Sequence, residues 1–476
     1  IILRGKSDSL TTIIIDNGEI TIKKSDDLRG LTTRETIKSL KKDLGEDYDI
    51  ACIGPAGENK VLFSNIMFSP GNFAGRGGAG AVLGSKNVKA IAVRGDKEVS
   101  VAKPEELERL RENMLIRIMW SPVFKSLREF GTPLLVNLVN EYYMLPVKNF
   151  QEFHSDKADN VSGETLKKEF SPSSRACFNC PIACKKVLKI NGEEIESPEY
   201  ESIWALGPLC CNYDLKSIIK LNKICNEQGL DTISAGSTIA SYIEATGQES
   251  KWGDPHYIEE LLLNLAIGSS DLSLGSKRLC EKLSRNSSMS VKGLELPGYD
   301  PRGAFGMALA YATSNRGGCH LRAYMVATEI LGVPTLLDRF SPFEKPELVV
   351  YFQNLSAAED SLVLCRFLLL EFDDEFLAKA LRLVTGLNYG RGELLKIGEK
   401  IWNLERLFNI QAGIPTSSDA LPSRLLKIPK NYPCKLKEIP LKSMLREYYR
   451  IRGWDSKGVP TKEKLSSLGI NVERVL

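Results

Sequence analysis

Residues 71–95 read GNFAGRGGAGAVLGSKNVKAIAVRG. Three of the glycines, Gly75, Gly77 and Gly80, match the G-x-G-x-x-G pattern of a dinucleotide-binding turn. That kind of site also requires a crossover helix of about a dozen residues between the turn and the next parallel strand. Only residues 81–88 separate the last glycine from the next predicted strand. The stretch therefore argues against a dinucleotide-binding unit and predicts a glycine loop within another kind of sheet.

The glycine loop has a second physical use. Because glycine lacks a Cβ, backbone N–H groups can approach an anion closely, and Arg76 adds a planar cation that suits phosphate. A tight turn within a sheet, with Arg76 solvated, accounts for the same residues equally well. The loop alone leaves both interpretations open.

The sequence around this loop predicts a β-rich region over residues 1–101. The run TTIIIDNGEITIKK alternates apolar and polar residues on both sides of Asn17-Gly18, which is typical of a hairpin. Thr32 followed by Glu35 forms a capping box that opens a helix ending before Gly45. Short strands are expected at residues 49–53, 61–67 and 89–93.

Helical periodicity dominates after Pro104, for example at residues 216–226, 257–266 and 375–384. We therefore predict an α+β multidomain protein in which a partial β-rich N-terminal domain precedes two mainly helical domains. The predicted domains cover residues 1–101, 102–289 and 290–476.

Composition limits the class of protein. A chain of 476 residues is too long for one ordinary core, and its content of 43% hydrophobic and 26% charged residues is that of a globular protein. The net charge of +3 favours neither nucleic acid nor a membrane surface as a partner. Without a long apolar run or a signal peptide, a cytoplasmic location is expected. Ile1 lies in what reads as a strand already under way, so we expect residues upstream.

Three of the eleven cysteines lie close together in RACFNCPIACKK, at Cys177, Cys180 and Cys184. The C-x2-C-x3-C spacing lets one loop supply three thiolates to an iron–sulfur cluster, with the fourth arriving from elsewhere. A structural zinc site usually shows a second close pair, which the sequence lacks. Spacing does not choose the fourth ligand among Cys52, Cys210, Cys211, Cys225, Cys280, Cys319, Cys365 and Cys434.

Several stretches together resemble the aldehyde:ferredoxin oxidoreductases. They are GRGGAGAVLGSKNVKAIAVRG, CFNCPIAC, PEYESIWALG, ELPGYDPRGAFGMALAYATSNRGGCH and DSLVLC, and the similarity extends in order along essentially the whole chain. The resemblance implies an anaerobic enzyme that oxidises aldehydes to carboxylic acids, with ferredoxin as acceptor. It also implies a tungsten (or molybdenum) bis-pterin and a [4Fe–4S] cluster. A non-catalytic iron–sulfur subunit for electron transfer or assembly is the alternative, because the family's first pterin-binding segments lie upstream of the matched region.

The resemblance also implies roles for individual residues. Glu201 and His320 match the substrate pocket, where Glu201 would act as a base toward water and His320 would polarise the aldehyde oxygen or relay a proton. Cys365 would be the fourth cluster ligand. The remaining matches are to pterin-binding positions, of which the first three would contact a pterin phosphate or its magnesium: Ala74, Gly75, Arg76, Leu230, Asp231 and Asp360.

Among the positions that depart from the family pattern, two bear on the cofactors. Val363, within DSLVLC, replaces a typical glycine, so the backbone near Cys365 is expected to differ. Lys220 replaces a glutamate that in some members holds a metal at a dimer axis. The resemblance therefore implies a possible homodimer without a bridging iron.

Overall fold

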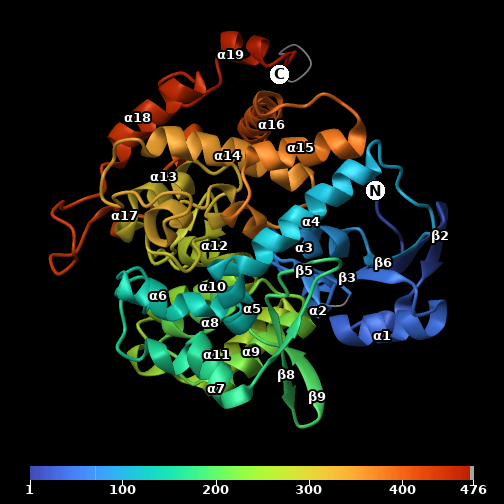
Figure 1. Cartoon of the computed structure of the whole chain (residues 1–476). Helices are drawn as coiled ribbons and strands as arrows, with labels where there is room; N and C mark the ends of the chain where they lie inside the picture. Colours follow the sequence, from blue (N-terminus) through green and yellow to red (C-terminus); the bar gives the residue numbers. More distant parts are fainter. Residues whose placement is uncertain (70, 472–476) are drawn as a thin grey trace.

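The computed structural model describes residues 1–69 and 71–471, in which a β-sheet with α1 lies to one side of a helical body (Figure 1). The six-stranded sheet has the order β2-β1-β6-β3-β4-β5. Only β1 and β6 pair in parallel, and the other neighbours are antiparallel. The combination confirms the α+β class. The strands are β1 (Thr11–Asp16), β2 (Glu19–Lys24), β3 (Asp49–Cys52), β4 (Ile66–Phe68), β5 (Asn72–Ala74) and β6 (Val88–Arg94).

Local sequence explains the beginning of this sheet. The hairpin pairs Ile13 with Ile22 across the turn at Asn17 and Gly18, as predicted. The side chain of Thr32 accepts a hydrogen bond from the N–H of Glu35, and the Glu35 carboxylate accepts one from the Thr32 N–H at 2.9 Å. This capping box opens α1 (Thr33–Leu44), which ends at Gly45. Both predictions are confirmed because each depends on residues close in sequence.

The strand expected over residues 61–67 is wrong in its first half. The backbone turns there instead, with the N–H of Ser64 donating to the Val61 carbonyl at 2.9 Å, and β4 begins only at Ile66. Val61 itself is buried beside α2 (Pro55–Glu58). Its apolar character therefore comes from packing against the helical body, not from a strand.

The glycine loop runs from β5 into a short helix, α3 (Ala79–Ser85). A Cβ at Gly84 would lie 1.9 Å from the carbonyl oxygen of Gly57, so only glycine lets α3 pack directly on α2. The following strand, β6, pairs with β1 and β3 and not with β5. This arrangement lacks the long crossover of a dinucleotide site, and the argument from length is confirmed.

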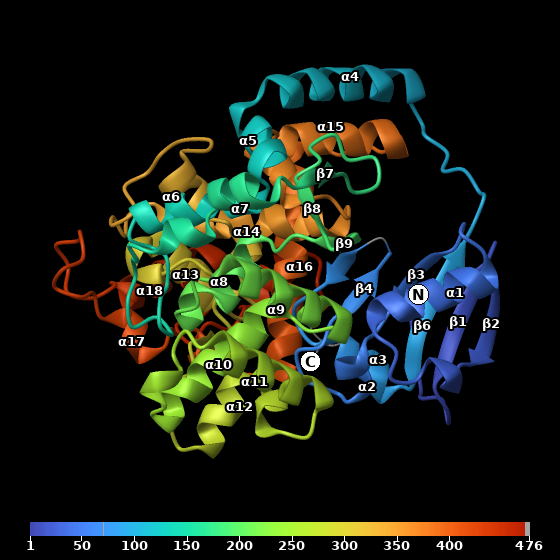
Figure 2. The ribbon, with the colours of Figure 1, turned by 90° about the horizontal axis from the view of Figure 1, so that it is seen from below.

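The helical body accounts for most of the remaining chain, and in Figure 2 α4 lies across α15 at its outer edge. No helix among residues 1–69 and 71–471 combines the length and apolar composition that crossing a membrane requires. The main helices are α4 (Pro104–Trp120), α5 (Pro122–Phe130), α6 (Leu135–Glu141), α7 (Gly163–Phe170), α8 (Tyr200–Leu206), α9 (Leu215–Gln228), α10 (Thr232–Thr246), α11 (Pro255–Ile267), α12 (Gly275–Lys282), α13 (Phe305–Thr313), α14 (Lys345–Ser361), α15 (Asp374–Thr385), α16 (Arg391–Gln411), α17 (Ser423–Leu426), α18 (Leu441–Arg452) and α19 (Lys462–Ser467).

A small antiparallel sheet interrupts the run of helices. The sequence interpretation missed this sheet. It consists of β7 (Ser173–Arg175), β8 (Lys185–Ile190) and β9 (Glu193–Glu196). The turn between β8 and β9 is Asn191-Gly192, with both residues at positive φ, which is the same hairpin signal that predicted the β1–β2 turn. The cysteine loop connects β7 to β8, so this sheet holds both of its ends.

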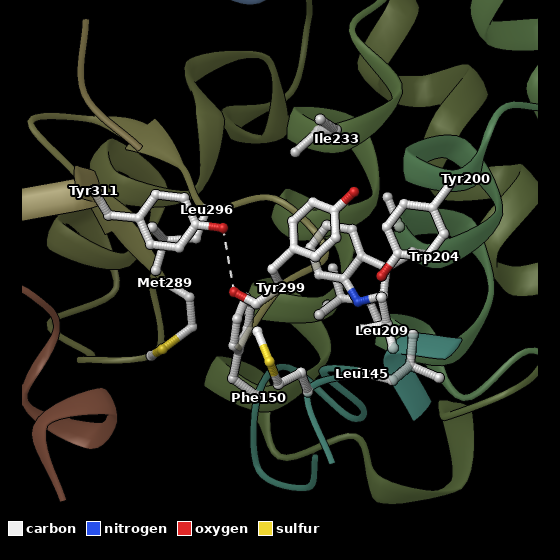
Figure 3. Close-up of a cluster of buried hydrophobic side chains, with 14 of the residues drawn as sticks. Leu145, Phe150, Tyr200, Trp204, Leu209, Ile233, Met289, Leu296, Tyr299 and Tyr311 are labelled. Carbon is white, nitrogen blue, oxygen red and sulfur yellow. Dashed lines mark hydrogen bonds between the residues drawn. The ribbon is translucent and has the colours of Figure 1, made fainter. Parts of the chain in front are cut away.

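The largest hydrophobic core joins α8, α10 and α13 (Figure 3). Trp204 is fully buried at its centre and donates from its indole nitrogen to the Pro146 carbonyl at 2.8 Å. Tyr311 is also buried, and its hydroxyl donates to the Tyr299 carbonyl at 3.2 Å. Because this core includes residues on both sides of position 290, the structure does not mark a boundary there, and the three domain ranges stay predictions.

Candidate active site

Glu201 and His320, predicted as the catalytic pair, lie together in the interior. Glu201 stands in the first turn of α8, and His320 lies in the loop that follows α13. Glu201 Oε1 is 3.6 Å from His320 Nε2, whereas Oε2 accepts a hydrogen bond from the Gly298 N–H at 2.9 Å. Glu201 Oε1 and His320 Nδ1 are buried without a hydrogen-bond partner in the described part of the chain. Since buried polar atoms are normally paired, this pair fits a site that a bound group completes.

Burial sets the protonation of both side chains. It raises the pKa of Glu201 to about 8, although the Gly298 N–H and the Arg76 charge oppose the shift. Burial, together with the nearby charges of Arg76 and Arg316, lowers the pKa of His320 to about 3. At neutral pH the imidazole is therefore uncharged, and Glu201 exchanges readily between its acid and base forms. This combination suits a carboxylate that takes up a proton beside a neutral hydrogen-bonding imidazole.

Three predicted cofactor residues, Gly75, Leu230 and Asp231, line one cavity of about 370 Å³. A Cβ built on Gly75 would meet nothing within 4 Å, so the loop leaves open space for a ligand next to its backbone. Ala74 ends the edge strand β5 with an exposed side chain and does not line this cavity. Polar residues that the sequence interpretation did not name contribute to the same wall: Asn72, Arg175, Lys185, Ser202, Asn226 and Thr232.

Arg76 is buried, so the interpretation in which its side chain is solvated is wrong. Its guanidinium donates to Asp231 Oδ2 at 3.2 Å, to the Gly318 carbonyl at 2.8 Å and to the Glu295 carbonyl at 2.6 Å. Asp231 in turn caps α10 by accepting from the Ile233 N–H at 3.0 Å. Arg76 therefore ties the glycine loop to α10 and to the loop that carries His320. These three partners occupy the guanidinium of Arg76.

We expect Arg76→Met to destabilise the folded chain by about 3–5 kcal/mol, because Asp231 would stay buried without its cation. The measurement is urea unfolding of the full chain without cofactors. Arg94→Met is the matched control, since Arg94 lies in β6 and forms its ion pairs in a half-exposed position, where the loss should be much smaller. If both variants lost the same free energy of unfolding, Arg76 would not join the glycine loop to its neighbours as described.

Asp360 lies apart from that first cavity, in the last turn of α14. Its carboxylate pairs with Arg322 at 3.2 Å and with Arg366 at 3.0 Å. Arg322 and Arg316 also line a second cavity of about 570 Å³ against α16. The sequence interpretation missed these three arginines, although each stands inside or next to a quoted motif. Arg322 also pairs with Glu405, and Arg366 with Glu359, so neighbouring carboxylates balance the charges of both arginines.

The four predicted cluster cysteines come from two segments that meet in one apolar group. Cys180 and Cys184 pack with Phe367 and Leu368, which follow Cys365 in sequence. Burial raises the pKa of Cys184 to about 12, and the charges of Glu199 and of the other three cysteines raise it further. Such thiols lose their protons when a metal binds them.

These thiols do not converge on a single point. Within residues 1–69 and 71–471, no three His, Cys, Asp or Glu side chains lie close enough to hold a single metal ion. A zinc site requires that tight grouping, whereas the ligands of a multi-iron cluster stand farther apart around a larger body.

Val363 explains why a glycine suits its position. The residue has φ 56°, in the left-handed region, and its side chain is 90% exposed. A β-branched residue is strained there, and no packing contact offsets the strain. Val363 thus adopts a conformation that glycine would adopt more easily, and the expected backbone difference from the glycine-containing members stays a prediction.

Val363→Gly should stabilise the chain by about 1 kcal/mol. The substitution relieves the backbone strain, and part of that gain is offset because glycine increases the conformational entropy of the unfolded chain. The unfolding midpoint of the cofactor-free chain measures this change. Val99→Gly is a suitable control because Val99 is also exposed but is not among the residues with positive φ. A lower midpoint for Val363→Gly would refute the strain.

Comparison with known protein families shows which family this chain belongs to. The family model for the N-terminal domain of aldehyde ferredoxin oxidoreductase matches residues 1–95, and the model for domains 2 and 3 matches residues 109–470. The chain belongs to the aldehyde ferredoxin oxidoreductase family. A tungsten-containing aldehyde ferredoxin oxidoreductase from Pyrococcus furiosus is 41% identical over 99% of this chain and 81% of its own length. The corresponding protein from Thermococcus kodakarensis is 40% identical with the same coverage.

Among solved structures, the BamBC active-site complex of benzoyl coenzyme A reductase matches with a TM-score of 0.81 and 22% identity, over 98% of this chain and 80% of its own. This likeness supports the aldehyde ferredoxin oxidoreductase fold alone. The family models and the curated relatives go further and identify the chain as an enzyme, an oxidoreductase that acts on aldehydes. A purely non-catalytic role, the alternative from the sequence, is not favoured by them.

Proposed function

We propose that this enzyme oxidises aldehydes to carboxylic acids and passes the electrons to ferredoxin. The reaction would take place at a tungsten (or molybdenum) bis-pterin centre connected to one [4Fe–4S] cluster. The observation that carries the proposal is the buried pair of Glu201 and His320, in which each side chain keeps one polar atom without a partner in the described chain. The names of the relatives, which are tungsten-containing and use ferredoxin, support the cofactor and the acceptor.

The residues around the two cavities would hold the pterins. In the first cavity these are the backbone of Gly75, with Leu230 and Asp231 on the opposite wall. Near the second, Asp360 and its arginine partners would meet the other pterin. Magnesium between the pterin phosphates would be bound beside Ala74. When bound, the metal–pterin group supplies an acceptor for two electrons, and the cluster on Cys177, Cys180, Cys184 and Cys365 supplies one-electron transfer.

The chain's own residues would manage the protons and the orientation of the substrate. Oxidation of an aldehyde consumes one water and releases two protons and two electrons with the acid. Glu201 in its ionised form takes a proton from the water that adds to the carbonyl carbon, and its pKa of about 8 lets it release that proton again. His320 is uncharged, so it adds no positive charge beside the nearby arginines. It donates a hydrogen bond to the aldehyde oxygen.

The test uses the cofactor-loaded protein, purified without oxygen, and follows ferredoxin reduction on adding ethanal. The expected composition is about one tungsten or molybdenum and about four iron atoms per chain. No further iron is expected at a dimer axis, since Lys220 pairs with Glu259 at 2.7 Å where a ligand would be required. Fully loaded protein with a reducible cluster but no aldehyde-dependent reduction would support the non-catalytic alternative.

A further inference from the structure

A continuous series of buried hydrogen bonds between side chains leads away from Asp231. The hydroxyl oxygen of Ser234 lies 2.8 Å from Asp231 Oδ2 and 2.7 Å from Glu295 Oε2. The other carboxylate oxygen of Glu295, Oε1, accepts a hydrogen bond from the Ser276 hydroxyl at 3.0 Å. Each of these four residues is at most 4% exposed, so the protein shields this part of the series from bulk solvent.

The outer end of the series reaches the surface. The hydroxyl oxygen of Ser276 is 2.8 Å from that of Ser288, which is 2.9 Å from that of Ser290. Ser288 and Ser290 both line a third cavity, of about 300 Å³, between α12 and the loop that precedes α17. Glu281 lines the same cavity, and its side chain is 62% exposed. Solvent therefore has access to the last two hydroxyl groups.

The inner end of the series lies next to the candidate catalytic pair. Ser202 and Thr232, which follow Glu201 and Asp231 in sequence, have their hydroxyl oxygens 2.8 Å apart. Burial is the main cause of the raised pKa of Glu201, and the charge of Asp231 raises it as well. That effect requires the two carboxyl groups to be close. The series therefore begins within the electrostatic reach of Glu201.

The order of the groups is that of a proton relay. A serine hydroxyl has one hydrogen and two lone pairs, so it can accept a proton on one side and give up its own on the other. Ser234 contacts two carboxylates and can donate to only one of them at a time. Its contact with the other is a hydrogen bond only when that carboxyl group carries a proton. Glu295 is thus placed to receive a proton in the middle of the series.

We propose that this series carries the proton released by Glu201 out to solvent. The inference rests on the proposed function and adds to it a route for one of the two protons that each aldehyde releases. One water molecule passes the proton from Glu201 to Asp231. Each later group takes up the incoming proton and passes one on, so the series itself gains no proton and no electron. Its members, in order, are Asp231, Ser234, Glu295, Ser276, Ser288 and Ser290.

Two substitutions interrupt the relay with little change of shape. Ser276→Ala removes the hydroxyl but keeps the Ser276 N–H, which donates to Glu295 Oε1 at 2.9 Å. Glu295→Gln retains an acceptor for that N–H but cannot take up a proton. Ser241→Ala is the matched control, because Ser241 is equally buried on α10 but donates to the Ser287 carbonyl at 3.1 Å, outside the series.

The first measurement is the turnover of ethanal by the loaded enzyme in H2O and D2O. Ser276→Ala and Glu295→Gln should each lower kcat by about tenfold and increase the solvent isotope effect on kcat. Their kcat/KM should stay within about twofold of wild type, because the proton leaves after the aldehyde has been oxidised. The Ser241→Ala control should keep the wild-type values.

A second measurement needs no turnover and separates this inference from the proposed function. At pH 6 Glu201 carries a proton, because its pKa is about 8. Its carboxyl C=O band in the infrared spectrum is identified by its absence from Glu201→Gln. After transfer of the resting loaded protein to D2O, this band shifts at the rate at which the proton exchanges with solvent. Ser276→Ala and Glu295→Gln should slow the shift by about tenfold, and Ser241→Ala should not.

The exchange rates decide the outcome. If wild type oxidises no aldehyde, the proposed function fails, and the infrared measurement still tests the relay. Slower exchange in either interrupted variant, with the control unchanged, supports the relay. Wild-type exchange rates in both interrupted variants would overturn the inference, whatever their kcat.

Discussion

Replacing Cys365 with alanine is expected to abolish the EPR signal of the reduced cluster and with it the aldehyde-dependent reduction of ferredoxin. The reason is that Cys177, Cys180 and Cys184 supply only three thiolates from one loop, and a cubane requires a fourth. The structure brings the segment after Cys365 into the same apolar group as Cys180 and Cys184. EPR spectroscopy of dithionite-reduced protein, together with iron and sulfide analysis, makes the measurement.

Cys434→Ala is the control for this prediction. Cys434 is also a free cysteine, but it packs against a different part of the core. Its replacement should leave the signal unchanged. A full reduced-cluster signal in Cys365→Ala would exclude Cys365 as a ligand, and loss of the signal in Cys434→Ala would move the assignment to that residue.

Glu201→Gln is expected to lower kcat by about 10²–10⁴-fold while the tungsten or molybdenum content stays unchanged. Glutamine retains the shape of the side chain but cannot accept a proton from water. Because the reactive form of Glu201 is the ionised one, the wild-type rate should rise with pH up to about 8. The variant should lose this dependence. Steady-state kinetics between pH 6 and pH 9 on metal-analysed protein measures both effects.

The control for the base is Glu244→Gln. The Glu244 side chain is 19% exposed, close to the 17% of Glu201, but it pairs with Arg424 on the far side of α10 and lines neither proposed pterin cavity. Its replacement should leave kcat within about twofold of wild type. Wild-type kcat in Glu201→Gln would exclude an essential base at this position.

Stability gives a second measure of the same carboxyl group. The folded pKa of Glu201 lies above its ordinary value of 4.5, so the unfolded chain releases this proton at lower pH than the folded chain does. The contribution to stability is therefore present below pH 4.5 and is lost as pH rises through about 8. In cofactor-free protein, Glu201→Gln should gain stability relative to wild type at pH 9 but not at pH 4.

Features that depend on neighbours in sequence could be predicted best. The β1–β2 hairpin and the capping box at Thr32 each follow from a few adjacent residues, and the structure has both of them. The Asn191-Gly192 hairpin carried an equally clear local signal and was missed because helical periodicity surrounds it. The arginines near Asp360 carried no such signal, because a surface cation and a ligand-facing cation look the same in sequence.

The sequence by itself determined the family, the α+β class and the residue types at the candidate site, since motifs and short-range patterns carry that information. Only the tertiary structure decided how these residues meet. It turned the Arg76 side chain onto Asp231, Gly318 and Glu295, and it buried Glu201 beside His320, which raises the pKa of one and lowers that of the other. Burial and long-range contact produce these properties, and no local pattern encodes them.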